Sequence, residues 1–288
     1  MNTKKWLKKN SILILLGSLL VVNVFIWYAV IVEERDGYLM VAFLDVGQGD
    51  AIFIEAPNGN QILIDGGSNK KVLRKLGGVM PFYDRSIDIV LATHPDKDHT
   101  GGLPDILKRY EVEAVITSDV QSDTSAYREF EKIIDDKRIK KIFARAGQII
   151  WLSNDIYIEI LFPDRSTSGW DSNTASVVAR LVYGDTEFLL TGDSPKKIEK
   201  YLTAQYGGKL HSDILKLGHH GSRTSTSRIF LSAVNPEYTI ISAGLNNRYG
   251  HPHKEVVEML KEFEISSLAT YENGTIVIKS DGKNIYIE

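Results

Sequence analysis

Apolar residues are distributed along this chain in two different ways. Ser11 to Val32, SILILLGSLLVVNVFIWYAVIV, is one continuous run without a charged residue. After position 36, apolar residues occur in short runs that are separated by polar, glycine-containing segments. The continuous run is long enough to cross a hydrocarbon layer of about 30 Å as a helix. The short runs predict strands that alternate with helices.

The part of the chain after position 36 predicts one α/β domain with much antiparallel character. Its predicted strands are Tyr38 to Leu44, Ala51 to Glu55, Gln61 to Ile64, Ile87 to Ala92, Ile156 to Leu161, Ser176 to Val182, Glu187 to Leu190, Asp213 to Leu217, Tyr238 to Ser242, Thr275 to Lys279 and Asn284 to Ile287. Its predicted helices are Pro104 to Tyr110, Ser125 to Asp135, Ser194 to Gln205, Thr226 to Val234 and His253 to Phe263. The segment Ala56 to Asn60, APNGN, predicts a hairpin turn.

The N-terminal run predicts a membrane anchor of one span. Residues 1–10 contain four lysines, and the acidic pair Glu33 and Glu34 follows the run. The positive-inside rule then places residues 1–10 in the cytoplasm, residues 11–32 in the membrane and the domain of residues 38–288 outside it. A cleaved signal peptide is the alternative, but the apolar run exceeds the usual signal length of about 7 to 15 residues and no small-residue cleavage site follows.

Charge and cysteine content limit the substrates and the metal ligands that the chain could use. Of 34 basic and 37 acidic residues, five basic and two acidic ones lie in residues 1–35, so the remainder is acidic by about six charges. This gives no broad electrostatic footprint for nucleic acid, and a polyanionic substrate would need a local positive centre. The chain has no cysteine, so a metal site would have to use His, Asp or Glu.

Histidine and aspartate follow several predicted strands directly. The segment THPDKDHTGG places four such residues in one loop, and further ones follow in TGD, LGHHGS and YGHP. Loops at strand ends are where a rigid scaffold presents reactive groups. The residues concerned are His94, Asp96, Asp98, His99, Asp193, His219, His220 and His251.

Each of these segments also has a purely structural interpretation. An aspartate of the first loop could cap a helix that starts near Thr100. HHGS could begin a helix with Ser222 and Ser225 as caps, and GHP is common in loops. The combination of all four segments in this order favours a shared ligand cluster.

The sequence resembles the metallo-β-lactamase fold, and specifically the metallohydrolase domain of the ComEC family of DNA-uptake proteins. The segments that carry the resemblance are FLDVGQGDAIFIEAPNGNQILIDGG, LATHPDKDHTGGL, FLLTGD, LKLGHHGSRTS and ISAGLNNRYGHP. The resemblance runs from about Leu39 to the C-terminus, without the long multi-span channel of those proteins. It implies a four-layer αβ/βα sandwich with two divalent metal ions, usually zinc, at one edge.

The resemblance also implies a ligand set. His94, Asp96, Asp98 and His99 correspond to the HxHxDH loop, with Asp96 in place of its second histidine. Asp193 corresponds to the bridging aspartate, and His251 to the late histidine. No histidine lies between His99 and Asp193, so His219 or His220 is expected to supply the missing ligand, with His219 ranked first.

Residue chemistry agrees with a dinuclear site. Imidazole and carboxylate suit zinc or manganese, and a carboxylate such as Asp193 can bridge two ions. Two such ions would lower the pKa of a bridging water towards 7 and make hydroxide the nucleophile. We expect zinc, with manganese as the alternative that the added Asp96 favours. Asp98 and His220 are the candidate catalytic residues.

Six further residues are candidates for supporting roles. Asp45 is expected to orient loop residues or to organise a β-turn, and the same alternatives hold for Asp50. Asp65 is expected behind the ligands, and Asn173 lies roughly where the superfamily has another histidine. Lys216 and Arg223 could bind a phosphate oxygen or be solvated.

Three functions remain open from the sequence. The first is a membrane-anchored metallohydrolase that cleaves phosphodiesters in DNA or another nucleic acid. The second is the same type of enzyme acting on a phosphocholine or other cell-wall phosphodiester, or on a small ester or amide. The third is a binding module without catalysis, which the intact His and Asp set argues against.

Overall fold

The computed structural model describes residues 10–32 and 37–288, and it divides the chain into a unit that ends at Gly37 and a unit from Tyr38 to Glu288. The first unit contains helix α2 (Ser11–Val32). Its side chains from Ser11 to Tyr28 are exposed, and this stretch is long and apolar enough to cross a membrane. A signal sequence would have the same properties. Most of the predicted cytoplasmic segment, residues 1–9, and the charged residues 33–36 lie outside the described residues.

Two mixed β-sheets form the second unit. The eight-stranded sheet has the order β15-β14-β1-β2-β3-β4-β5-β6, and the seven-stranded sheet has the order β13-β12-β11-β10-β9-β8-β7. The first sheet consists of β1 (Leu39–Phe43), β2 (Ile52–Glu55), β3 (Gln61–Ile64), β4 (Ser86–Ala92), β5 (Glu111–Thr117), β6 (Lys140–Phe143), β14 (Ile276–Ser280) and β15 (Ile285–Ile287). The second consists of β7 (Ile149–Trp151), β8 (Ile156–Phe162), β9 (Val178–Tyr183), β10 (Thr186–Leu190), β11 (Ile214–Lys216), β12 (Tyr238–Ile241) and β13 (Ser266–Ala269).

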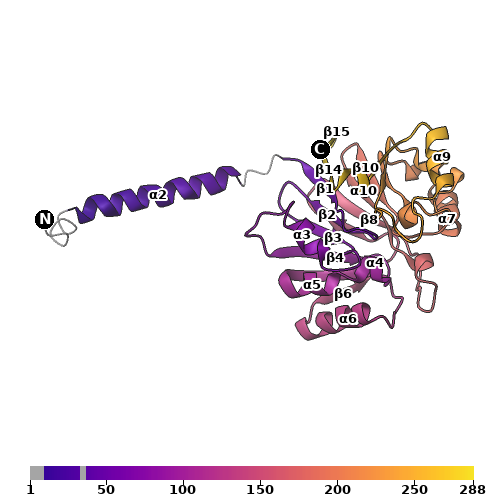
Figure 1. Cartoon of the computed structure of the whole chain (residues 1–288), viewed down its shortest axis with the longest axis horizontal. Helices are drawn as coiled ribbons and strands as arrows, with labels where there is room; N and C mark the ends of the chain where they lie inside the picture. The colour runs from indigo at the N-terminus through magenta and orange to yellow at the C-terminus, as the bar shows by residue number, and fades with distance from the viewer. Residues whose placement is uncertain (1–9, 33–36) are drawn as a thin grey trace. The chain divides into compact units, whose positions relative to one another are not determined.

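Helices cover the outer face of each sheet, so the domain has four layers (Figure 1). The helices α3 (Lys71–Leu76), α5 (Leu103–Arg109) and α6 (Ser125–Lys137) pack on the first sheet. The helices α7 (Lys196–Tyr206), α8 (Arg228–Val234) and α9 (Lys254–Glu262) pack on the second. The short helices α4 (Lys97–Thr100) and α10 (Thr270–Asn273) lie in connections. This is the predicted αβ/βα sandwich of the metallo-β-lactamase fold.

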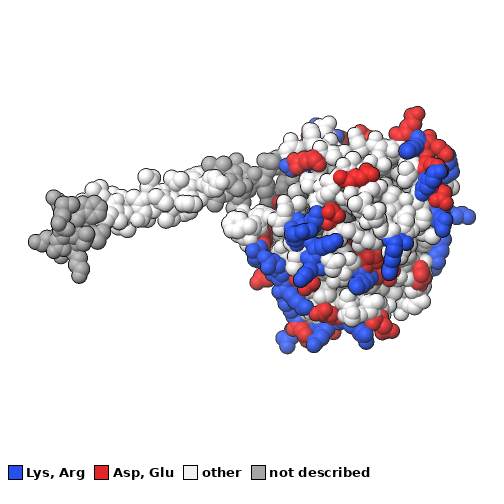
Figure 2. Space-filling model, viewed as in Figure 1, with Lys and Arg blue, Asp and Glu red and all other residues white. Residues whose placement is uncertain are grey.

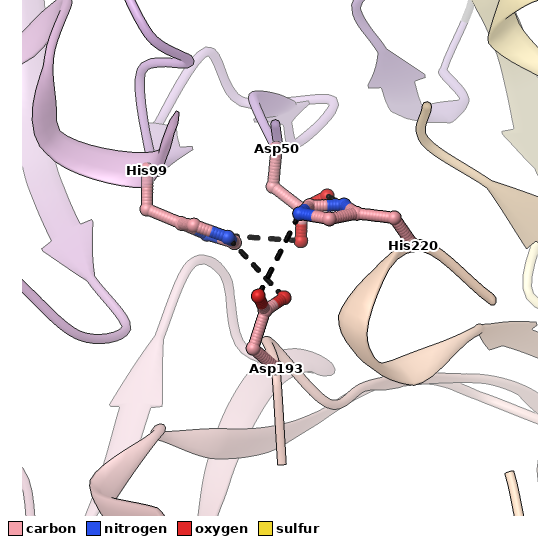
Figure 3. A group of neighbouring side chains, drawn as sticks. All are labelled: Asp50, His99, Asp193 and His220. Carbon is pink, nitrogen blue, oxygen red and sulfur yellow. Dashed lines mark ion pairs between the residues drawn. The ribbon is translucent and has the colours of Figure 1, made fainter. Parts of the chain in front are cut away.

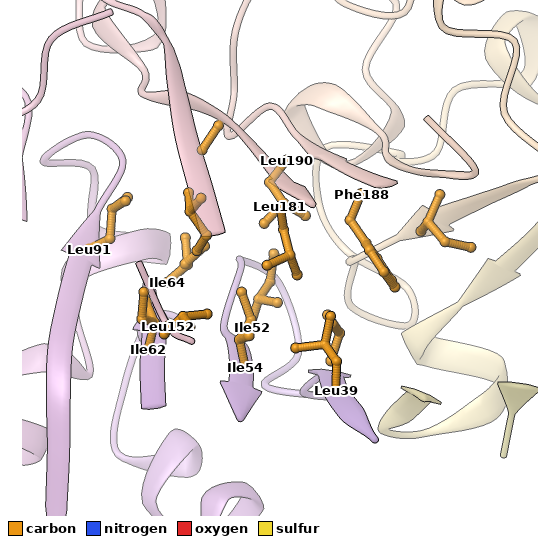
Figure 4. Packing of buried hydrophobic residues seen from close by; sticks show 14 of the residues in the cluster. Leu39, Ile52, Ile54, Ile62, Ile64, Leu91, Leu152, Leu181, Phe188 and Leu190 are labelled. Atoms are coloured by element: carbon orange, nitrogen blue, oxygen red, sulfur yellow. The ribbon is translucent and has the colours of Figure 1, made fainter. Parts of the chain in front are cut away.

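The alternation of side chains along each strand explains how the two sheets contribute to three apolar cores, one between the sheets and one under each layer of helices. In β1, Val41 and Phe43 belong to the core between the sheets, whereas the intervening Ala42 belongs to the core under the helices. Successive side chains of a strand point to opposite faces, so a sheet covered on both sides must be apolar on both. Figure 4 shows the inner core, where Ile52 and Ile64 of the first sheet face Leu181 and Phe188 of the second.

Strand direction places the candidate loops at one edge. β10, β11 and β12 are mutually parallel, so the loops after them begin at the same edge of the second sheet. β3 and β4 are parallel, and β1 runs in the same direction because β2 is antiparallel to both β1 and β3. The loops after β1, β3 and β4 therefore share an edge of the first sheet.

Most predicted strands and helices are confirmed to within two residues, including the β2–β3 hairpin at APNGN. The sequence interpretation omitted β5, β6, β7, β13 and α3. β6 and β7 have only exposed and half-buried positions and carry exposed Phe143 and Trp151, so neither has the buried apolar run that marks a strand. Their assignment depends on pairing with neighbouring strands rather than on local pattern.

The surface of the domain carries both signs of charge. Figure 2 shows Lys and Arg interspersed with Asp and Glu on the visible face, and basic side chains gather where α3 lies in Figure 1. Lys70, Lys71 and Arg74 of that region are exposed. The basic surface is thus local, as the acidic balance of the domain requires.

Candidate metal centre

The candidate residues converge on Asp193, which is buried in the loop after β10. The Nε2 atom of His99 lies 3.2 Å from Asp193 Oδ1. Nε2 of His219 and Nε2 of His220 each lie 3.6 Å from Asp193 Oδ2, and Nε2 of His94 lies 3.9 Å from it. Four imidazoles from two loops, those after β4 and β11, therefore present the same nitrogen to one carboxylate.

Two of the imidazoles are held from behind by carboxylates. Nδ1 of His99 lies 2.7 Å from Asp65 Oδ2, and Asp65 also accepts hydrogen bonds from the backbone N–H and hydroxyl of Thr93. Nδ1 of His220 lies 3.3 Å from Asp50 Oδ1. A carboxylate at Nδ1 fixes the ring orientation and directs Nε2 outward, as it does behind metal-binding histidines.

The second of these carboxylates has its own buried cation. Lys216 is fully buried, and its amine contacts Asp50 Oδ2 and approaches the carbonyl oxygen of Gly192. A buried charge must be paired, so Lys216 and Asp50 stabilise each other. The result is a chain from Lys216 through Asp50 to His220 that ends at Asp193.

Several buried atoms of the centre have no hydrogen-bond partner among the described residues. They include Nε2 of His94, Nε2 of His99 and Oδ1 of Asp193. His99 Nε2 and Asp193 Oδ1 are close but are not aligned as a hydrogen bond. Unpartnered buried nitrogen and oxygen atoms that converge on one point fit a divalent cation, which accepts both ligand types.

The structure also contains a compact group that could hold one ion. Ligand atoms of Asp50, His99, Asp193 and His220 lie within 4.8 Å of one another, and all four residues are buried (Figure 3).

The remaining predicted ligands lie around this group. Oδ2 of Asp98 lies 3.3 Å from Nε2 of His220, and Oδ2 of Asp96 lies 3.7 Å from Nε2 of His94. The ring of His251 lies 5.3 Å from that of His219, and its buried Nδ1 has no partner among the described residues. Every residue of the predicted ligand set is thus near the centre.

The supporting residues divide into two groups. Asp65, Lys216 and Asn173 reach the centre, the last with Nδ2 3.4 Å from Nδ1 of His219. Asp45 instead accepts a hydrogen bond from the backbone of Gly47 and pairs with Lys75 at 2.8 Å. The exposed Arg223 lies 3.7 Å from Glu255 on the surface.

Asp50 is the buried group that the sequence interpretation did not include among the ligands. Its backbone N–H donates to the carbonyl oxygen of Asp98 at 3.2 Å, which joins the LDVGQGD and HPDKDH loops. The preceding Gly49 has φ +120°, and a Cβ there would lie 1.9 Å from that carbonyl oxygen. The glycine before Asp50 is the local signal of this close approach.

The HHGS segment has an unusual backbone. His219 and His220 have φ of 49° and 58°, in the left-handed region that residues with a Cβ rarely adopt. Ser225 donates to the carbonyl oxygen of Ser194, and α8 begins only at Arg228, so Ser222 and Ser225 do not cap it. Strained backbone that the surrounding structure maintains is typical of functional sites.

Asp96 likewise does not act as a helix cap. It precedes α4, but its side chain makes no capping hydrogen bond. Its Oδ2 atom instead lies 3.7 Å from Nε2 of His94.

Burial keeps three of the histidines neutral. It lowers the pKa of His94 to about 4, with the neighbouring His99 contributing in the same direction. Burial also lowers the pKa of His219, and it lowers the pKa of His251 to about 4. Neutral imidazole is the form that binds a metal.

The other two histidines hold protons when no metal is bound. Burial disfavours their charged forms, but Asp193 and the carboxylates behind them outweigh it. The pKa of His99 is raised well above its usual value, and that of His220 is raised to about 9. In turn, although burial alone would raise it, these cations lower the pKa of Asp193 well below its usual value. Without a metal ion, the protons on His99 and His220 supply the positive charge that balances Asp193.

The pKa values of Asp96 and Asp98, the two carboxylates of the HPDKDH loop, are shifted in opposite directions. The pKa of Asp98 is lowered because His220 and His99 outweigh the effect of burial. The pKa of Asp96 is raised, mainly by burial and in part by Asp98. Asp98 is thus ionised at neutral pH, beside the centre and partly open to solvent.

A four-layer sandwich with a buried His and Asp cluster at the strand ends defines a protein of the metallo-β-lactamase fold. The chain belongs to the metallo-beta-lactamase superfamily, whose sequence profile matches residues 44–244.

The chain also resembles particular proteins of known name. It is 30% identical over 256 residues to ComE operon protein 3 of Bacillus subtilis and 31% identical over 240 residues to competence protein ComA of Neisseria gonorrhoeae. Each alignment covers 82% of this chain, but only 32% and 31% of the respective relative. The chain thus spans about a third of the length of these relatives.

A solved structure supports the fold. The metallo-beta-lactamase fold protein YhfI from Bacillus subtilis has a TM-score of 0.56 and 15% sequence identity, and the match covers 84% of this chain and 100% of that one. At this identity the similarity establishes a common fold and nothing about the reaction.

Proposed function

We propose that this protein is a metal-dependent hydrolase that cleaves phosphodiester bonds in DNA or another nucleic acid. The observation that carries the proposal is the convergence of four imidazole Nε2 atoms on the buried carboxylate of Asp193. The competence proteins among its relatives support a nucleic-acid substrate.

The arrangement favours two binding positions that share Asp193. His94 and His220 both face Oδ2 of Asp193, the former beside Asp96 and the latter beside Asp98, while His99 faces Oδ1. Two divalent ions there, zinc or manganese, would polarise a phosphoryl oxygen and lower the pKa of a coordinated water.

The protein's own residues would orient the substrate and donate a hydrogen bond to it. His220 is buried and held by Asp50, which suits a ligand, whereas the side chain of His219 is 26% exposed, which suits contact with substrate. We therefore assign His220 as a ligand and His219 as the donor to the phosphate or leaving group, which exchanges the roles that the sequence suggested. His251 packs beside His219 and completes the set. The ionised Asp98 would accept a proton from the attacking group.

Metal content and turnover of the full chain in detergent test this assignment. Asp193→Ala is expected to lose at least one of about two bound ions and all detectable hydrolysis, because a shared carboxylate serves both positions. His220→Ala is expected to lose metal and activity together. His219→Ala is expected to keep its metal and to lose activity by roughly 10²- to 10⁴-fold.

The exposed His211 provides a matched control, since it precedes β11 and lies at the end of the strand opposite the centre. His211→Ala should keep both metal and turnover. A substrate panel of single-stranded DNA, duplex DNA, RNA, a phosphocholine ester and a carboxylic ester identifies the reaction. Wild-type protein that binds no metal, or that cleaves only the non-nucleic esters, would contradict the proposal.

We propose further that α2 anchors the protein in the membrane, with residues 1–10 in the cytoplasm and the domain outside. The apolar stretch from Ser11 to Tyr28 and the lysines before it support this orientation. Protease added to intact cells should digest the domain while a cytoplasmic marker remains whole. Protection of the domain until the membrane is opened would reverse the topology, and release of the domain from membranes by salt would indicate cleavage of the helix.

A further inference from the structure

A pocket opens directly beside the candidate metal centre. It has a volume of about 420 Å³, and its lining includes Gln48, Lys97, Asp98, Arg248 and Tyr249. Asp98 belongs to both the pocket and the centre, since its Oδ2 atom lies 3.3 Å from His220. A molecule in this pocket would therefore adjoin a bond that is cleaved at the centre.

The aromatic wall of the pocket is held in place from one side. The ring of Tyr249 lies 5.7 Å from that of His251 with an interplanar angle of 20°, which is a stacked arrangement. Even so, 48% of Tyr249 remains exposed. A half-exposed aromatic ring beside a reactive centre is a surface on which a flat group can stack.

The loop that carries Tyr249 is fixed by one amide side chain. Asn247 donates from Nδ2 to the carbonyl oxygens of Gly244 and His251, and its Oδ1 accepts from the backbone N–H groups of Tyr249 and His251. Gly244 in turn donates to Gln48 Oε1 at 3.2 Å, which ties the loop to the opposite wall. The pocket is thus formed before a ligand arrives.

Two cations line the pocket together with the aromatic ring. The Arg248 guanidinium lies 4.8 Å from the centre of the Tyr249 ring. Lys97 is exposed on the facing loop, and within residues 37–288 neither cation forms an ion pair. Two cations without an ion-pair partner that line the same pocket as an aromatic ring suit a flat ring with phosphates beside it.

A basic surface continues from the pocket. A Cβ built on Gly47, next to Gln48, would lie 3.4 Å from the Lys71 amine, so this lysine reaches the pocket wall from α3. The exposed Lys70 and Arg74 extend the same surface, where basic side chains gather in Figure 2. A strand that leaves the pocket in this direction would keep its phosphates near positive charge.

We propose that this pocket binds an unpaired nucleobase next to the scissile phosphodiester by stacking on Tyr249, and so selects single-stranded over duplex nucleic acid. The inference rests on the proposed function and adds a substrate subsite to it. A base in a duplex is already paired and stacked between its neighbours, so it cannot enter the pocket unless the duplex opens. A neutral sugar or peptide would leave the cations without a partner.

The test removes the Tyr249 ring from the protein and the bases from the oligonucleotide, separately and together. Full-length protein in detergent is given a single-stranded oligothymidylate or the same oligonucleotide with a run of abasic sites. In the wild type, loss of the bases is expected to lower kcat/KM about tenfold, a typical effect of one stacked base. In Tyr249→Ala, the two oligonucleotides should be cleaved equally, and Tyr249→Phe should restore the wild-type preference.

A tyrosine of equal exposure provides the control. Tyr83 is 51% exposed and precedes the start of β4, whereas the centre lies beyond the end of that strand. Tyr83→Ala should keep the tenfold preference. A preference for bases that persists unchanged in Tyr249→Ala, or equal cleavage of single-stranded and duplex DNA by the wild type, would overturn the subsite.

A binding measurement tests the subsite independently of the proposed hydrolase activity. If the wild type cleaves no nucleic acid, the proposed function fails, and fluorescence anisotropy with the same oligonucleotides then decides the subsite alone. A weaker affinity for the abasic strand in the wild type but not in Tyr249→Ala supports the pocket. Equal affinities in the wild type, or no binding of either strand, reject it.

Discussion

Replacing Lys216 with methionine should strongly destabilise the domain, because it removes the cation that has the largest effect on the buried carboxylate of Asp50. Both side chains are buried, at 0% and 1% exposed, and their charged atoms are in contact. Burial alone would raise the pKa of Asp50, but Lys216 and then His220 outweigh it and lower that pKa, so the carboxylate is ionised at neutral pH. Methionine keeps most of the lysine volume, so the change removes a charge without leaving a large cavity.

The expected magnitude follows from this burial. Removal of one partner from a buried ion pair costs roughly 3–5 kcal/mol of unfolding free energy. For a domain of this size, that corresponds to a melting temperature lower by on the order of 10 °C. The double variant Asp50→Asn/Lys216→Met removes both charges of the pair, while His220 keeps Asp193 and Asp98 beside it, and should recover more than about half of the loss.

Thermal unfolding followed by circular dichroism, with a chelator present to remove metal, measures these differences. The pair of Lys75 and Asp45 is the matched control, because its atoms are 2.8 Å apart but its side chains are 22% and 33% exposed. Lys75→Met should cost under about 1 kcal/mol. If Lys216→Met costs no more than this control, or if the double variant is as unstable as the sum of its two single variants, the reasoning about the buried pair is refuted.

Three further predictions concern the centre and the loops around it. Because the pKa values of His99 and His220 are raised, metal binding must displace their protons, and the apparent metal affinity should increase with pH up to about 9. Calorimetry of metal binding in two buffers of different ionisation enthalpy should therefore give different heats, and equal heats would contradict this. Gly49→Ala should reduce metal content and lower the melting temperature, because its Cβ would overlap the carbonyl oxygen of Asp98, and a variant with normal metal content and stability would disprove the close approach. Burial would raise the pKa of Asp119, but hydrogen bonds from a neighbouring loop lower it, so its contribution to stability is present above about pH 4 and is lost as the pH falls through the lowered pKa. Asp119→Ala should therefore lose about 2 kcal/mol at pH 7 in urea unfolding and less at pH 2, and an equal loss at both pH values would speak against this assignment.

Local sequence patterns determined most of the secondary structure. The strands of the core have apolar side chains on both faces, as in Val41, Ala42 and Phe43, and such runs indicate a covered sheet wherever the chain later places them. The hairpin at APNGN follows from a glycine with φ +92° at position 59, which is a local requirement. β6 and β7 could not be predicted in this way, because only pairing with other strands stabilises them.

The sequence also indicated the components of the centre but not their arrangement. His94, Asp193 and His251 follow strand ends in glycine-containing loops, and that position is visible without a structure. Which nitrogen faces Asp193 depends on groups behind each ring, and these come from distant parts of the chain. The sequence left that question open because ring orientation is set by contacts across space.

The roles of Asp50, Lys216 and the HHGS histidines were decided by the tertiary structure alone. Asp50 and Lys216 are separated by more than half of the chain, and each would be an ordinary solvated residue in a local interpretation. The left-handed backbone at His219 and His220 turns adjacent residues to unequal depths, so that only one is fully buried. Pairing of buried charges and strained backbone arises only when the two sheets pack together, because only then are these groups removed from water.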